Sequence, residues 1–196
     1  GHDPANLRVP TFEFTANLRI SADPLATIKA VTEAAKALLT DDDKARIKAR
    51  SEKLATVSAA RIADLITEAE ARSGDTPIDP LWLSYQISRA VDDNCIVLDD
   101  TLGPSRFSEY LRCRKPLSYI RNPGSSGGWG PGAAFGAKMG APDKDIICVT
   151  GDGFYQFGTP QPAIWAGAHH GAPFLTIVYT NRSYTTGTLA VQNSFG

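Results

Sequence analysis

The chain has 196 residues, and its 20 basic and 21 acidic side chains leave a formal net charge of −1. This balance provides no electrostatic attraction to nucleic acid or to an anionic membrane surface, so partners of both kinds are disfavoured. The length suffices for one domain of medium size with its own core, together with an appended segment.

The cysteine spacing and the hydropathy of the sequence indicate the cellular compartment of the protein. Cys95, Cys113 and Cys148 show no CxxC spacing, and two of the three lie in apolar runs where a thiol behaves as a small hydrophobic group. The sequence has no apolar stretch of about 18 residues and no signal-peptide pattern. We therefore expect reduced thiols, a cytoplasmic location and no membrane span.

The N-terminal part of the chain is expected to lie outside the main domain. Residues 3–20 are irregular, and Phe12-Glu13-Phe14 is the one piece that could pair as a short strand. Asp23-Pro24 predicts the start of a helix, because Asp caps helices and proline suits the first helical position. We assign residues 1–40 to a preceding unit.

A connector is predicted to follow. Residues 41–74 open with Asp41-Asp42-Asp43, which favours a helix N-terminus, and they carry a thin apolar stripe at helical spacing. We expect a connector helix that ends in the Gly- and Pro-containing break near residue 74. The domain boundary is predicted near Asp75.

Residues 75–196 alternate between strand-like and helix-like segments. Short apolar, β-branched runs separated by helical patterns are typical of a parallel sheet that is covered on both faces. We therefore predict an α/β fold: a doubly wound parallel sheet with helices on both faces, preceded by the helical connector. The expected strands are residues 95–99, 118–121, 146–150 and 174–179, and the expected helices start at Asp79-Pro80 or span residues 105–111, 132–139 and 162–169.

The strongest functional motif is Gly151-Asp152-Gly153, which follows the strand-like run at residues 146–150. Asn181 ends the next strand-like run. Because neighbouring parallel strands bring their carboxyl ends to one edge of a sheet, we expect Asp152 and Asn181 to lie together. A carboxylate and a carboxamide oxygen suit a hard cation such as Mg²⁺, and the flanking glycines let amides approach an anion. The pattern predicts a metal-diphosphate site.

Two further loops are expected at the same edge. Residues 99–103 contain Thr101, and the glycine-rich residues 125–130 contain Gly127 and Gly128. Amides in glycine turns and at helix starts can bind phosphate oxygens, and a Thr hydroxyl adds a donor. Taken singly, each feature also has a structural explanation, because Thr caps helices and glycines allow tight packing.

The order of these loops resembles that in a known family. Gly-Ala-Ala-Phe-Gly-Ala-Lys at residues 132–138, then Ala141-Pro142-Asp143 and then Gly151-Asp152-Gly153 are similar to the diphosphate-binding domain of thiamine-diphosphate-dependent enzymes. The nearest group resembles acetolactate synthase large subunits and benzoylformate decarboxylase. Residues 75–196 carry the resemblance, with the domain expected to be truncated at its C-terminus, and residues 1–40 resemble the end of the family's central domain.

The resemblance implies two cofactors, thiamine diphosphate and Mg²⁺. By resemblance, three residues ligate the metal: Asp152, Asn181 and, through its backbone carbonyl, Ser183. The same resemblance and the glycine loop give the remaining cofactor-binding residues as Thr101, Gly127, Gly128, Gly153, Phe154 and Tyr184. The chain departs from the family at two positions. Gly127 stands where relatives often have a bulky Met or Leu that supports the bent cofactor, and Thr180 stands where they usually have Asn.

The resemblance also implies an activity, that of a 2-keto acid decarboxylase or carboligase of the acetolactate synthase type. In this family an acidic residue on a separate pyrimidine-binding domain activates the cofactor, and we expect that domain to come from missing sequence or from a partner subunit. We therefore name no catalytic residue in this chain. We expect the chain to be inactive alone and to form part of a homo-oligomer, since its apolar helix stripes need a covering surface.

Two other functions stay open from the residues alone. A glycine-rich turn followed by Asp152 at an interval of roughly 20 residues is also found in nicotinamide-dependent oxidoreductases of Rossmann type. That interpretation gives Asn181 no role, and Pro131 interrupts its turn. The chain is alternatively a non-catalytic subunit or assembly domain. His169-His170 is interpreted as a pair at the end of a helix rather than as a metal site.

Overall fold

The computed structural model describes residues 17, 18, 20, 22–101, 106–111, 115–122 and 127–195. The strand expected at Phe12-Glu13-Phe14 and the thiol of Cys113 lie outside these residues. Contacts divide the chain into two compact units, Gly1–Ala59 and Ala60–Gly196, and the division falls within helix α2 (Asp41–Glu70). None of the helices within the described ranges combines the length and the hydropathy needed to cross a membrane.

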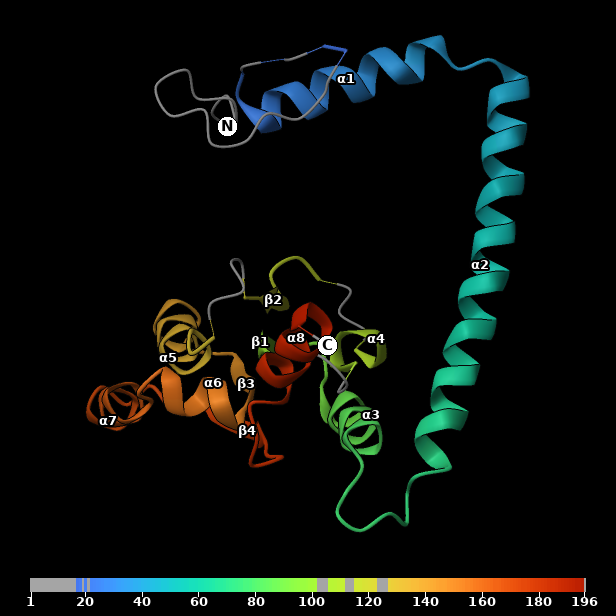
Figure 1. The fold of residues 1–196 in the computed structure, drawn as a ribbon. Coiled ribbons are helices and arrows are strands. Elements are labelled where there is room, and N and C mark those ends of the chain that lie inside the picture. The colour runs from blue at the N-terminus through green and yellow to red at the C-terminus, as the bar shows by residue number, and fades with distance from the viewer. Residues whose placement is uncertain are drawn as a thin grey trace. The chain divides into compact units, whose positions relative to one another are not determined.

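The first unit contains helix α1 (Pro24–Leu38) and the first part of α2 (Figure 1). Asp23 caps α1, because its Oδ1 accepts a hydrogen bond of 2.8 Å from the amide of Ala26. At the start of α2, the amide of Thr40 donates to the Oδ2 of Asp43, and the amide of Asp43 donates to the Oγ1 of Thr40. Both helices therefore begin where their capping residues predict.

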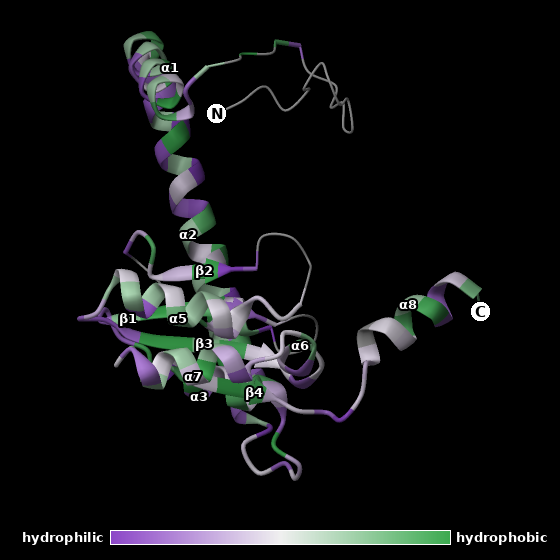
Figure 2. Ribbon diagram, turned by 90° about the vertical axis from the view of Figure 1, so that its left-hand side faces the viewer, coloured by the Kyte–Doolittle hydropathy of each residue, from purple (hydrophilic) through white to green (hydrophobic). Residues whose placement is uncertain are grey.

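The second unit is built on a four-stranded sheet with the order β2-β1-β3-β4. All its strand pairs are parallel, which confirms the predicted fold class. Hydrophobic residues run along β3 (Figure 2), as expected for a strand covered on both faces. The strands are β1 (Cys95–Asp100), β2 (Tyr119–Arg121), β3 (Asp145–Gly151) and β4 (Leu175–Tyr179).

Helices cover both faces of this sheet (Figure 1). They are α3 (Pro80–Ala90), α4 (Phe107–Tyr110), α5 (Gly130–Gly140), α6 (Asp152–Phe157) and α7 (Gln161–His169). Helix α8 (Thr185–Phe195) follows β4, and its described residues are exposed. On one face, α3 and α4 enclose a buried cluster of Ile87, Val97, Phe107 and Val149. On the other face, α5 encloses Leu98, Ala134, Ile146 and Cys148. Successive residues of β1 therefore enter different layers, as strand geometry requires.

Two short helices were not predicted. α6 begins at Asp152, within the motif that we expected to be a loop after a strand, and α8 follows the last strand. The glycines of the motif and the Thr-rich start of α8 give little helix propensity, so these helices lack a local signal.

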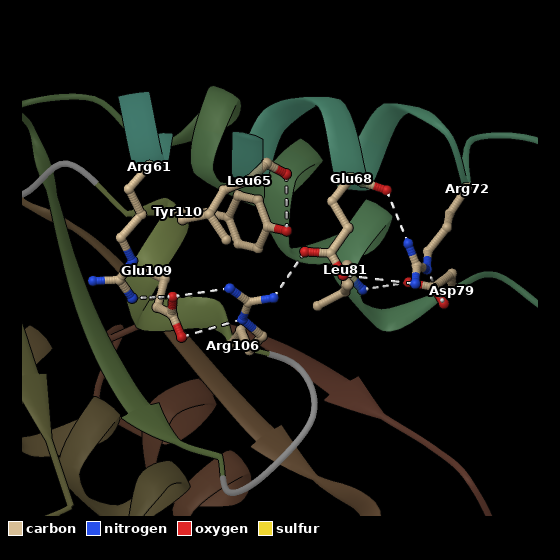
Figure 3. A network of polar contacts seen from close by, with 9 residues as sticks. All are labelled: Arg61, Leu65, Glu68, Arg72, Asp79, Leu81, Arg106, Glu109 and Tyr110. Atoms are coloured by element: carbon tan, nitrogen blue, oxygen red, sulfur yellow. Dashed lines mark hydrogen bonds and ion pairs between the residues drawn. The ribbon is translucent and has the colours of Figure 1, made fainter. Parts of the chain in front are cut away.

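The last turns of α2 pack against α3 and α4 within the second unit. Leu65 and Ala69 of α2 are buried there, and the hydroxyl of Tyr110 donates to the carbonyl of Leu65 at 3.2 Å. Around this apolar contact, alternating charges form a chain of ion pairs (Figure 3). Its members are Arg61, Glu109, Arg106, Glu68, Arg72 and Asp79.

Candidate functional site

The carboxyl ends of the four strands meet at one edge of the sheet. The pairing sets Asp100 at the end of β1 opposite Thr150 of β3, and it sets Gly151 opposite Tyr179 of β4. β2 ends beside them at Arg121. The loops predicted to carry chemistry follow these positions, so the topology brings them to a common edge.

Asp152 lies directly after β3 and is bonded to the segment that follows β4. Its Oδ2 accepts hydrogen bonds from the hydroxyl of Thr180 at 3.0 Å and from the amide of Arg182 at 2.8 Å. Its Oδ1 accepts a bond of 2.8 Å from the amide of Gly153. Because the donors Thr180 and Arg182 flank Asn181, the carboxylate of Asp152 lies beside the segment that carries Asn181.

The carboxyl group of Asp152 is held in its ionised form. Burial raises its pKa, but hydrogen bonds from the amide of Arg182 and the hydroxyl of Thr180 outweigh this effect and keep the pKa below its ordinary value. The side chain therefore carries a negative charge at neutral pH. An ionised carboxylate is the kind of hard oxygen ligand that Mg²⁺ prefers.

Asn181, Ser183 and Tyr184 lie in the exposed segment between β4 and α8. The Oδ1 of Asn181 accepts a bond of 2.9 Å from the amide of Ser183, and its Nδ2 donates to the hydroxyl of Thr185 at 3.1 Å. These two bonds fix the orientation of the carboxamide. The ring of Tyr184 lies against Gly153, since a Cβ added at that glycine would come within 2.9 Å of the ring.

Thr101 is held by Asp99, the first of two consecutive buried carboxylates at the end of β1. The Oδ1 of Asp99 accepts bonds of 2.9 Å and 2.7 Å from the amide and the hydroxyl of Thr101. Its Oδ2 accepts a bond of 2.5 Å from the hydroxyl of Tyr119, and burial together with this contact raises the pKa of Tyr119. The hydroxyl proton of Thr101 therefore points to Asp99.

The glycine turn, which we define as residues 127–130, is held by the second carboxylate. The Oδ2 of Asp100 accepts bonds of 3.0 Å from the amides of both Gly128 and Gly130. Its Oδ1 accepts a bond of 2.7 Å from the Nδ2 of Asn122. The sequence predicts that amides of the glycine loop face phosphate, whereas the amide of Gly128 binds Asp100.

The glycine turn is in direct contact with the region around α6. Gly128 has a φ of 96°, which favours glycine, and a Cβ there would lie 2.5 Å from the Cα of Gly158. A Cβ at Gly127 would overlap the ring of Phe154. The ring of Phe154 therefore fills the space beside Gly127, where the resemblance places a bulky side chain in relatives.

Five residues at this edge make contacts that the sequence analysis did not assign. Polar residues at or just after strand ends are a usable signal in a parallel sheet, and this signal applies to Asp99, Asp100, Asn122 and Thr180. The fifth residue, Gly158, has no such signal, because its approach to Gly128 is a long-range contact.

Packing and helix-end positions account for the surroundings of Trp129, His169 and His170. Trp129 packs in the layer between α5 and the sheet. His169 ends α7 and stacks on Trp165 with ring centroids 4.8 Å apart, while His170 caps the same helix. This arrangement agrees with a pair at a helix end.

The residues of this edge fit a magnesium-bound diphosphate. Asp152 and Asn181 offer a charged and a neutral oxygen from adjacent strand ends, and Mg²⁺ usually combines few protein ligands with phosphate oxygens and water. Within the described ranges, no group of three or more His, Cys, Asp or Glu side chains is placed so that it could hold a metal ion. A metal at this edge must therefore use neutral oxygens as well as the carboxylate.

The parallel sheet and the polar groups at its carboxyl edge define an α/β domain of the kind that binds cofactors at its strand ends. Residues 103–196 match the family described as "Thiamine pyrophosphate enzyme, C-terminal TPP binding domain". This part of the chain is therefore similar to the thiamine-diphosphate-binding domain of that family, which confirms the predicted resemblance.

Three curated relatives are similar to part of the chain. The chain is 27% identical over 117 residues to "Probable acetolactate synthase large subunit" of Methanococcus aeolicus, covering 56% of this chain and 19% of the relative. It is 29% identical over 111 residues to "2-hydroxyacyl-CoA lyase 2" of Mus musculus, covering 55% and 17%. It is 29% identical over 92 residues to "Benzoylformate decarboxylase" of Pseudomonas aeruginosa, covering 47% and 17%. The chain thus spans less than a fifth of these relatives.

Solved structures show the same fold. The thiamine diphosphate-dependent 4-hydroxybenzoylformate decarboxylase of Rhodococcus jostii RHA1 superposes with a TM-score of 0.54 at 25% identity, over 61% of this chain and 23% of that chain. The benzoylformate decarboxylase of Polynucleobacter necessarius gives a TM-score of 0.53 at 14% identity over the same shares, which supports the fold alone.

Proposed function

We propose that this chain binds the diphosphate end of thiamine diphosphate through Mg²⁺ in a 2-keto acid decarboxylase or carboligase, an enzyme of the lyase or transferase class. The observation that carries this proposal is the ionised carboxylate of Asp152, bonded to residues on either side of Asn181. The names of the relatives, which include an acetolactate synthase and two decarboxylases of aromatic 2-keto acids, support the substrate class.

In this proposal the chain binds and orients the cofactor. Asp152, Asn181 and the backbone carbonyl of Ser183 ligate the metal, and Thr101, Gly153 and Phe154 lie near the diphosphate. When bound, thiamine diphosphate supplies the nucleophilic carbon that attacks a substrate carbonyl. The family match favours this function over the nicotinamide alternative.

The rest of the enzyme belongs to the proposal as well. A pyrimidine-binding domain from other sequence or from a partner subunit completes the site, and the assembly is a cytoplasmic homo-oligomer that acts on a 2-keto acid. The small share of each curated relative that this chain covers supports a contribution from other sequence. Buried, free thiols at Cys95 and Cys148 fit a reducing compartment.

A titration of the 196-residue chain by two-dimensional NMR tests the metal site. We expect Mg²⁺ and thiamine diphosphate together to shift the amide signals of residues 151–154 and 180–184, and Asp152→Ala or Asn181→Ala to abolish these shifts. Asp64→Asn, which changes an exposed carboxylate on α2, is the matched control and should titrate as the unaltered chain does. Shifts that persist without Asp152 would contradict the proposal.

The same sample tests the division of labour between domains. We expect the chain alone to bind the cofactor weakly and to consume neither pyruvate nor benzoylformate. Turnover of either substrate by the purified chain would show that the chain contains its own catalytic acid.

A further inference from the structure

The second carboxylate of β1, Asp100, has a completely buried side chain whose two oxygen atoms are both engaged. It has 0% exposure, it lies at the carboxyl end of the strand, and it accepts hydrogen bonds from Gly128, Gly130 and Asn122. A buried carboxylate is costly unless its oxygens are satisfied. Three donors from two different segments meet this requirement, so the surrounding backbone is arranged around this side chain.

The two carboxylates of β1 serve different layers. Successive residues of a strand point to opposite faces of the sheet. Asp99 points to the face covered by α4, where it binds Thr101 and Tyr119. Asp100 faces the layer of α5, where it binds the glycine turn. One strand end thus binds Thr101 through Asp99 and the glycine turn through Asp100.

Asp100 also occupies the N-terminus of α5. This helix of 11 residues begins at Gly130, and the N-terminus of a helix attracts anions through its unpaired amides and its dipole. The carboxylate of Asp100 takes the amides of Gly128 and Gly130. A side chain of the protein itself therefore binds amides at the start of α5 that could otherwise bind a phosphate.

The fit around this carboxylate is tight. A Cβ added at Gly130 would lie 3.0 Å from the Cβ of Asp100 and 2.7 Å from the Sγ of Cys148. A Cβ at Gly128 would likewise lie 2.5 Å from the Cα of Gly158, so neither glycine of the turn leaves space for a side chain. The turn's conformation is set by the carboxylate that it encloses.

We infer that Asp100 is a positioning residue for the cofactor site: it fixes the glycine turn by binding two of its amides, and Asn122 fixes Asp100. In consequence, the diphosphate is bound at the Asp152 side of the edge, and the glycine turn meets the cofactor with groups other than these amides. This inference rests on the proposed function and assigns that site a residue that does not itself touch the cofactor.

Amide hydrogen exchange of the 196-residue chain, measured by NMR without cofactor, tests the first step. Asp100→Leu keeps the branching of the side chain but replaces both acceptor oxygens by larger methyl groups, and we expect exchange at Gly128 and Gly130 to speed up about tenfold or more. Asp100→Asn retains an acceptor oxygen and should preserve most of the protection. Unchanged exchange in the Leu variant would overturn the inference.

Two further variants keep the test decisive. Should Asp100→Leu fail to fold, Asn122→Ala removes the donor to the Oδ1 of Asp100 while Asp100 itself stays in place, and it should still speed up exchange at the same two glycines. Leu65→Ala, which weakens the distant contact between α2, α3 and α4, is the control for general destabilisation and should leave these two amides no more affected than other amides of the sheet.

A titration with Mg²⁺ and thiamine diphosphate tests the second step. We expect the dissociation constant to rise at least about tenfold in Asp100→Leu and little in Asp100→Asn. Equal affinity in the Leu variant and the unaltered chain would overturn the positioning role but leave the proposed function intact. Absence of binding by the unaltered chain would instead count against the proposed function itself, and the positioning role would fall with it.

Discussion

At the scale of single residues, the charge of Asp152 depends on donors that reach it from the segment after β4. Thr180→Val removes the hydroxyl donor but keeps the shape of the side chain, so we expect the pKa of Asp152 to rise toward its ordinary value. A carbon-13 NMR titration of the Asp152 carboxyl group measures this shift. Thr32→Val, which removes an exposed hydroxyl in α1, should leave the pKa unchanged.

The sign of the accompanying stability change follows from linkage. The pKa of Asp152 is lower in the folded chain than its ordinary value of 3.8. The ionised carboxylate therefore stabilises the fold above pH 3.8, and this contribution is lost as the pH falls through the folded pKa. In Thr180→Val the contribution should be smaller. A pKa that does not move in this variant would show that the backbone donors alone hold the charge.

At the scale of elements, the ion pairs of Figure 3 join the last turns of α2 to α4. The guanidinium of Arg106 binds Glu68 of α2 at 2.9 Å and Glu109 of α4 at 3.2 Å, and its side chain is 35% exposed. We expect Arg106→Ala to lower the free energy of unfolding by about 1 kcal/mol, since a partly buried bridging arginine loses bonds to two carboxylates. Urea denaturation measures the change.

Two comparisons give this prediction its controls. Arg106→Lys keeps the charge but cannot span both carboxylates in the same way, so we expect an intermediate loss. Lys36→Ala breaks an exposed pair on α1, with Glu33, and should have almost no effect on stability. An equal loss for Arg106→Ala and Lys36→Ala would show that the bridge contributes no more than an ordinary surface pair.

The elements also show why part of the fold could be predicted. Strands β1, β3 and β4 each contain a run of apolar or β-branched residues, and helices α1 and α3 have the local start signals Asp23-Pro24 and Asp79-Pro80, so local sequence was sufficient for these elements. α6 and α8 lack such signals. In the same way, the motif around Asp152 was visible in the sequence, whereas the role of Asp100 depends on amides 28 and 30 residues away.

At the scale of the whole molecule, the sequence and the contacts give different divisions of the chain. The helical periodicity of the sequence breaks near Asp75 and predicts a domain boundary there. The contacts divide the chain between Ala59 and Ala60. The difference arises because Leu65 and Ala69 are buried against α3 and α4, with 5% and 0% exposure, and such contacts cannot be seen in the periodicity of α2.

Two truncated chains decide between these boundaries. A chain of residues 60–196 keeps the packing of α2 on α3 and α4, so we expect its urea midpoint for the sheet to match that of the full chain. A chain of residues 75–196 loses Leu65 and Ala69 and uncovers Leu81 and Tyr110, and we expect it to lose about 2–5 kcal/mol, the cost of emptying a buried leucine site. Equal stability of the two truncated chains would instead support the boundary at Asp75 and make the last turns of α2 a dispensable connector.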